Sequence, residues 1–206
     1  MKRKDKNIIR SQMSPIHASL LAIGWLFVAL FLLGVFSSCK KIDENGFRTY
    51  TIKEGKHKSR TRYKTTKTNH LQFQAIFDES AIYTSQDPAN QYDVNKLYGL
   101  SDCGNDHTET SIRFGWRWLN DSLEILWFKH TNNNFSFAKI KSIDFNEIVN
   151  FGIQFDTDYY YMSVGAETVT ISRPCNQSSN RKYFLWPYFG GNETAPHDIK
   201  IKIKDL

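Results

Sequence analysis

Short alternating runs of apolar and polar residues, separated by turn residues, dominate the chain after residue 47. Two runs alternate between apolar and polar residues as half-buried strands do: residues 71–77 (LQFQAIF) and residues 112–118 (IRFGWRW). Asn120-Asp121 and the Asn-rich stretch 131–134 mark turns between such runs. No stretch of a dozen residues after Phe47 shows helical periodicity. The sequence therefore predicts an all-β domain.

About ten predicted strands with turns every 8–15 residues indicate one β-sandwich, and a strand near Tyr50 pairing with the C-terminal strand would close a jelly roll. A lipocalin-like barrel is the alternative, because strand number does not distinguish the two. Residues 199–203 place Ile and Lys on opposite faces, which is typical of an edge strand with outward lysines. The basic stretch 53–67 is interpreted as a solvated hairpin, with contact to anionic lipid as the alternative.

The N-terminus predicts export. Five Lys or Arg residues within the first ten precede an uncharged run at 20–36, and Ser37 and Ser38 precede Cys39. Residues 36–39 resemble a bacterial lipobox, in which the cysteine thiol receives a diacylglycerol and becomes the new N-terminus. We therefore expect residues 1–38 to be a helical signal peptide, 39–46 a tether and 47–206 the β domain. An uncleaved anchor is the alternative.

The expected location follows from this signal. The chain would be a lipoprotein of the cell envelope, held in the outer membrane by the fatty acyl chains on Cys39 and facing the periplasm or the cell surface. Residues 68–206 carry a net charge of −5, although the whole chain carries +6. The body of the protein is therefore not expected to bind nucleic acid.

Two groups of residues are candidates for structural chemistry. Cys103 and Cys175 form an even pair in an exported domain, which favours a disulfide. Asp102, Asp106 and Glu109 lie in one polar loop and are candidate calcium ligands, although their spacing is not that of an EF-hand. Ordinary turn chemistry explains the same composition. No cofactor other than this calcium is expected.

Aromatic residues are the candidate ligand-binding groups, because aromatic rings stack on sugars. Trp116, Trp118, Trp186 and Tyr188 are the candidates. Alternation places Trp116 and Trp118 on the face of Ile112 and Phe114, which favours a core position, and places Arg113 and Arg117 on the opposite face.

The motifs FGWRW (114–118) and YFGG…APHDI (188–199), together with the cysteine pair, resemble an uncharacterised family of Bacteroidota lipoproteins. The resemblance implies a β domain and brings no activity. No nucleophile elbow, phosphate loop or zinc-protease motif is present. We therefore expect a module that binds glycan or another envelope component rather than an enzyme. The alternatives are a structural lipoprotein acting through protein contacts and a carbohydrate-active enzyme with two carboxylates in a cleft.

Overall fold

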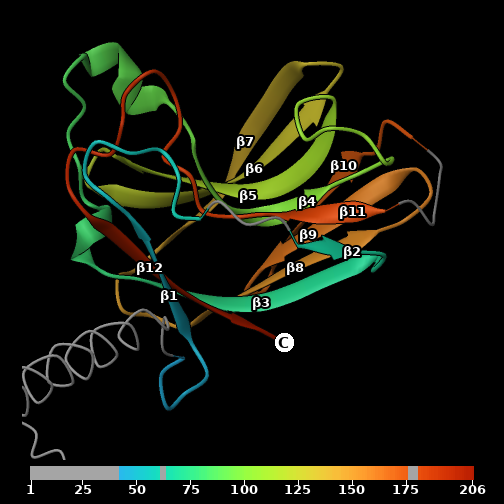
Figure 1. The fold of residues 1–206 in the computed structure, drawn as a ribbon, viewed down its shortest axis with the longest axis horizontal. Coiled ribbons are helices and arrows are strands. Elements are labelled where there is room, and N and C mark those ends of the chain that lie inside the picture. Colours follow the sequence, from blue (N-terminus) through green and yellow to red (C-terminus); the bar gives the residue numbers. More distant parts are fainter. Residues whose placement is uncertain (1–41, 61–63, 176–180) are drawn as a thin grey trace, which may run out of the picture. The chain divides into compact units, whose positions relative to one another are not determined.

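The computed structural model describes residues 42–60, 64–175 and 181–206. The predicted signal peptide and Cys39 lie outside these residues. The described part is all-β, with two six-stranded antiparallel sheets packed face to face (Figure 1). No helix in this part has the length and hydrophobicity that a membrane span requires. The predicted sandwich is confirmed, and two separate sheets replace the alternative single barrel.

One sheet, called the β3 sheet, contains both ends of the domain. Its strands, in spatial order, are β1 (Arg48–Ile52), β12 (Ile199–Asp205), β3 (His70–Phe77), β8 (Val149–Phe155), β9 (Tyr159–Val164) and β10 (Glu167–Ser172). The predicted pairing of the first and last strands is confirmed, with Tyr50 opposite Ile201. β12 was wrongly predicted as an edge strand. β12 lies between β1 and β3. The alternating lysines suggested that one edge of β12 is unpaired, but β1 pairs with that edge.

The other sheet, called the β5 sheet, carries the longest strands. In spatial order they are β2 (Thr65–Thr66), β11 (Lys182–Leu185), β4 (Asn95–Ser101), β5 (Thr110–Leu119), β6 (Ser122–Thr131) and β7 (Asn134–Ile143). Two 3₁₀ helices, η2 (Glu79–Ala81) and η3 (Pro88–Tyr92), lie between β3 and β4. The predicted hairpin at Asn120-Asp121 is confirmed, and both residues have the positive φ of a type I′ turn. Asn132-Asn133 repeats this geometry between β6 and β7.

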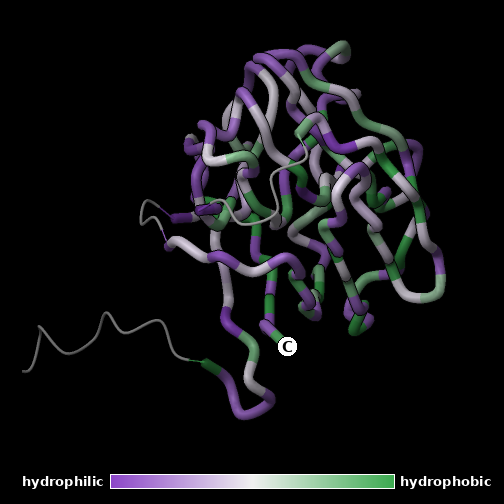
Figure 2. Tube along the Cα trace, turned by 90° about the vertical axis from the view of Figure 1, so that its right-hand side faces the viewer, coloured by the Kyte–Doolittle hydropathy of each residue, from purple (hydrophilic) through white to green (hydrophobic). Residues whose placement is uncertain are grey.

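Alternation along the strands builds the core between the sheets. Figure 2 shows this alternation as hydrophobic and hydrophilic colours that follow one another along the chain. Phe73 of β3 lies 4.9 Å from Phe151 of β8, ring centroid to ring centroid, and meets the edge of Phe114 from the β5 sheet at 5.8 Å. All three rings are buried. Such aromatic contacts bury large apolar areas and hold the two sheets together.

A buried ionic cluster joins the sheets at one end. Asp102, just after β4, accepts two hydrogen bonds from the Arg173 guanidinium at 2.6 and 3.0 Å. The Tyr160 hydroxyl from β9 donates to the same carboxylate at 2.8 Å, and the Lys182 ammonium lies 3.9 Å away. The predicted disulfide between Cys103 and Cys175 is confirmed and lies beside this cluster. Covalent and ionic links therefore fix the chain at the same place.

Candidate functional site

A groove of about 850 Å³ lies on the outer face of the β5 sheet, the face turned away from the core. Figure 1 shows the curved β5 sheet with the β6–β7 hairpin rising from it. Outward residues of β4, β5, β6 and β7 form its floor and one wall. The segment 184–188 and Gly191-Asn192 form the opposite wall.

Positive charge dominates the groove. Among the described residues that line it, four are Lys or Arg and a single one, Asp93, carries a carboxylate. The four cationic side chains are Lys58, Arg60, Lys96 and Arg113. A concave surface lined by one sign of charge concentrates ligands of the opposite sign.

Arg113 is the central cation of the groove. It projects from β5 opposite Gly99 of β4, and a β-carbon at Gly99 would collide with the Arg113 side chain, so the glycine makes room for it. Arg113 is only 7% exposed, and within the described part of the chain its Nε has no hydrogen-bond partner. Burial lowers the pKa of Arg113 to about 10, so the guanidinium stays charged at pH 7. A buried charge without a counter-ion is unfavourable and is satisfied by an anionic ligand.

Lys96 lies beside Arg113, on the β4 segment where one extra residue interrupts the register with β5. Its ammonium donates to the Val94 carbonyl at 2.6 Å and lies 4.5 Å from the centre of the Phe128 ring. Burial, together with the nearby Arg113 charge, lowers the pKa of Lys96 to about 8. The two cations therefore repel each other in a partly desolvated site, and an anion between them would relieve that repulsion.

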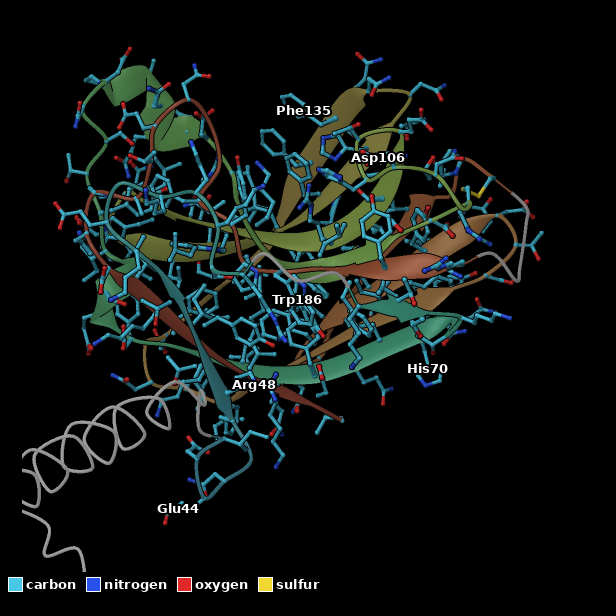
Figure 3. All side chains as sticks on the ribbon, viewed as in Figure 1. Glu44, Arg48, His70, Asp106, Phe135 and Trp186 are labelled. Atoms are coloured by element: carbon cyan, nitrogen blue, oxygen red, sulfur yellow. A yellow bond between two sulfur atoms is a disulfide. The ribbon has the colours of Figure 1, made fainter. Side chains whose placement is uncertain are left out.

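Two histidines also line the groove. His130 of β6 lies 3.3 Å from the Ser111 hydroxyl, and burial followed by the Arg113 charge lowers its pKa to about 4. His107 lies 3.1 Å from the Asp106 carboxylate at the rim (Figure 3), and burial lowers its pKa as well. At pH 7 His130 is neutral and therefore offers a hydrogen bond rather than a charge.

Hydrogen bonds hold the wall at residues 186–191 in place. Tyr188 pairs with Lys96 through two backbone hydrogen bonds of 2.8 and 2.9 Å. The amide of Gly190 donates to the buried Asn95 side chain at 2.8 Å, and a β-carbon at Gly190 would collide with the Val94 carbonyl. The glycines of the YFGG motif therefore permit the close approach that shapes the groove.

The four aromatic residues predicted to bind ligand are not brought together. Trp116 is completely buried in the core, where it meets Phe77 and Tyr83, so its side chain does not reach a ligand. Trp118 packs against Phe145. Trp186 and Tyr188 do line the groove.

Trp186 and Tyr188 are themselves held by neighbouring rings. Trp186 stacks on Tyr98 at 5.3 Å, and the Arg60 guanidinium lies 4.6 Å from its ring centre. Tyr188 stacks on His57 at 5.2 Å. Both residues therefore contribute to a fixed wall of the groove.

The three candidate calcium ligands are also separated. The Asp102 carboxylate is buried with Arg173, while Asp106 accepts hydrogen bonds from Thr108. Among the described residues, the group with metal-ligand geometry is Asp102 with Cys103 and Cys175, whose sulfurs form the disulfide. Turn and ion-pair chemistry accounts for the contacts of Asp102 and Asp106, and calcium binding by this loop stays a prediction.

Glycoside hydrolysis ordinarily needs two carboxylates facing the scissile bond, about 5 to 10 Å apart. The described lining of the groove offers Asp93 alone. The described lining therefore offers one carboxylate where this mechanism uses two.

No protein-family model matches the chain, and no curated protein matches it significantly. Solved structures do share its fold. An alginate lyase, AlyC3, superposes with a TM-score of 0.58 over 84% of this chain and 79% of the other, at 10% identity. A family 16 glycoside hydrolase from a Bacteroides ovatus mixed-linkage glucan locus gives 0.54 over 81% and 83%, also at 10% identity. The fold is thus the jelly-roll sandwich of these carbohydrate-active proteins.

Sequence reasoning missed most of this site. Lys58 and Arg60 belong to the basic stretch that was interpreted as a solvated hairpin, but Lys58 bridges to Tyr188 at the groove. Arg113 was assigned correctly to the outward face of its strand. The outward face of β5 is recognisable as part of a groove only in the folded structure, where β4, β6 and β7 lie in the same sheet.

Proposed function

We propose that the domain binds an acidic polysaccharide in the groove of the β5 sheet. The observation that carries the proposal is the buried Arg113 guanidinium, whose Nε has no hydrogen-bond partner among the described residues and whose charge acts on the neighbouring cation Lys96. A carboxylate is the natural ligand for such a guanidinium, because it accepts two parallel charge-assisted hydrogen bonds.

The fold supports a sugar as the carrier of that carboxylate. One of the similar structures is an alginate lyase in complex with dimannuronate, a uronic acid disaccharide. Another is a family 16 endo-glucanase from Bacteroides ovatus. Fold likeness alone is weak support for a function. The charge of this groove selects the uronate over the neutral glucan.

Titration of the full-length protein in detergent with alginate oligomers tests the proposal. We expect saturable binding by calorimetry that weakens as salt increases, because exposed charges in the groove are screened. The matched control ligand is the same oligomer with its carboxyl groups reduced to alcohols, which we expect not to bind. Equal binding of both ligands, or binding of neither, would contradict the proposal.

The same titration has a predicted pH dependence. The Lys96 ammonium, with a pKa of about 8, is charged below that pH and neutral above it. Anion affinity should therefore fall between pH 7 and pH 9, while the uronate itself stays ionised throughout. Lys96→Met should flatten this part of the profile. A wild-type affinity that is constant across this range would contradict a Lys96 ammonium that loses its proton between pH 7 and pH 9 in the site.

A second candidate function is cleavage of the same polyuronate by β-elimination. In that reaction a base removes the C5 proton, the C4–O bond breaks, and a C4–C5 double bond forms as the leaving oxygen gains a proton. The neutral His130 imidazole in the groove favours this candidate, but a pKa of about 4 makes it a weak base. Ultraviolet absorbance of the unsaturated product tests it, and its absence over prolonged incubation would leave binding alone.

We also propose that acyl chains on Cys39 anchor the domain in the outer membrane. The lipobox-like residues 36–39 and the apolar run before them support this. Such an anchor would hold the polysaccharide-binding groove at the membrane. Cys39→Ser should abolish incorporation of labelled fatty acid, and unchanged labelling would exclude Cys39 as the acceptor.

A further inference from the structure

Three phenylalanine rings line the groove beside its cations. Phe128 belongs to β6, and Phe135 and Phe137 belong to the outward face of β7, with Phe137 directly opposite Phe128. Their planes lie within 14° of one another, and their ring centroids are 5.5 to 6.2 Å apart. We call these three residues the phenylalanine platform.

The platform is exposed where a folded protein would normally bury such rings. Phe135 is 62% exposed and Phe137 is 37% exposed, while Phe128 beneath them is buried. Figure 3 shows Phe135 on the β6–β7 hairpin above the curved sheet. Burial of these side chains would stabilise the fold, and their exposure forgoes that stabilisation. A contiguous group of exposed apolar rings therefore indicates a contact surface for a ligand or partner.

The platform adjoins the anion site directly. The Lys96 ammonium lies 4.5 Å from the centre of the Phe128 ring, and the Arg113 guanidinium carbon lies 5.7 Å from it. A ligand that contacts both the phenylalanine platform and the two cations needs an apolar face and an anionic group. The two must lie no more than one or two sugar units apart. Inorganic anions would leave the rings uncovered, and a neutral sugar would leave the cations without a counter-ion.

We propose that Phe135 and Phe137 form a stacking subsite for a pyranose ring of a uronate-containing glycan whose carboxylate is held by Arg113. The inference rests on the proposed function and deepens it, because it names the ring-binding residues and the substrate class. The C–H face of a pyranose covers the exposed rings in the way that aromatic side chains pack on one another.

A second copy of this chain is the competing occupant, and the charges disfavour it. β7 is the edge strand of its sheet, and it carries Lys139 and Lys141. Lysines on an edge strand oppose pairing with another strand. Two copies meeting through the groove would also bring their cationic linings together.

The experiment compares two matched pairs of variants. The test pair is Phe135→Ala with Phe137→Ala on β7. The control pair is Tyr159→Ala with Tyr161→Ala on β9 of the other sheet, where the two residues are also alternate, exposed and in ring contact. Calorimetry of the full-length protein with alginate oligomers is done at several salt concentrations. Single Phe135→Tyr tests rescue, because it keeps an aromatic ring.

We expect the test pair to weaken binding about 10- to 100-fold at every salt concentration. The salt dependence should be unchanged, because no charge is removed, whereas Arg113→Met should reduce it. The control pair should bind like the wild type, and Phe135→Tyr should keep near wild-type affinity. The thermal unfolding temperature of the test pair should stay close to that of the wild type, because both rings are exposed.

Other results overturn the inference in distinguishable ways. If the test pair binds as tightly as the wild type while Arg113→Met does not bind, the subsite is wrong and the proposed function stands. If the wild-type protein binds no uronate oligomer, both are wrong. If the wild type is dimeric in solution and the test pair is monomeric, a second copy occupies the platform.

Discussion

Arg113→Met should strongly weaken binding of acidic glycan and at the same time stabilise the protein. The guanidinium is buried, charged and without a partner at Nε, so its removal from the unliganded protein relieves a desolvation penalty. We expect the free energy of unfolding to rise by about 1 to 3 kcal/mol. Affinity for uronate should fall at least about 100-fold, or roughly 3 kcal/mol. Chemical denaturation and calorimetry measure the two quantities.

The matched control is Arg117→Met, on the same face of β5 four residues further along. Arg117 is paired with Glu124 at 2.7 Å and does not line the groove. This variant should lose stability, because Glu124 loses one of its two cationic partners, and should keep its affinity within about threefold. Loss of stability in Arg113→Met together with retained affinity would mean that the guanidinium has a structural role.

Asp102→Asn should cause the largest loss of stability of any single polar substitution considered. The change leaves the Arg173 guanidinium and the Lys182 ammonium buried without their carboxylate. Breaking a buried pair by removing one partner costs about 3 to 5 kcal/mol. For a domain of this size, the thermal unfolding temperature should fall by roughly 6 to 20 °C. Calorimetric unfolding with the disulfide intact measures it.

Asp43→Asn provides the control for Asp102→Asn. Asp43 lies 3.7 Å from Lys202 in an ion pair whose side chains are 35% and 48% exposed. Exposed pairs contribute at most about 1 kcal/mol, so this variant should unfold close to the wild type. Equal stability of the two variants would show that the Asp102 cluster does not hold the sheets together.

The fold was largely predictable because its determinants are local. Alternation identified β3, β5 and β12, and the Asn120-Asp121 turn identified one hairpin. β4 was missed, because its extra residue opposite β5 places Leu97 and Tyr98 in the core one after the other and breaks the alternation. The position of β12 inside its sheet depends on its neighbours, β1 and β3. The alternation of apolar and polar residues along one strand does not tell which strands pair with it.

The groove was not predictable from the sequence, because its positive charge is local and the net charge of residues 68–206 has the opposite sign. Residues 68–206 are net acidic, yet Lys96 and Arg113 lie together on one face of a sheet beside Lys58 and Arg60 from the basic stretch. Attention to tryptophan also misled the search for a binding surface. Trp116 is core, whereas the exposed rings of the groove are phenylalanines at 135 and 137.

Binding of a carboxylate to Arg113 can be observed at the guanidinium itself. The most direct test follows the Nε–H signal of Arg113 by nuclear magnetic resonance during titration of the full-length protein with an alginate oligomer. Because Nε has no partner in the unliganded protein, its signal should shift strongly on binding and be absent from spectra of Arg113→Met. Binding that leaves this signal unchanged and shifts residues of the β3 sheet instead would contradict the account.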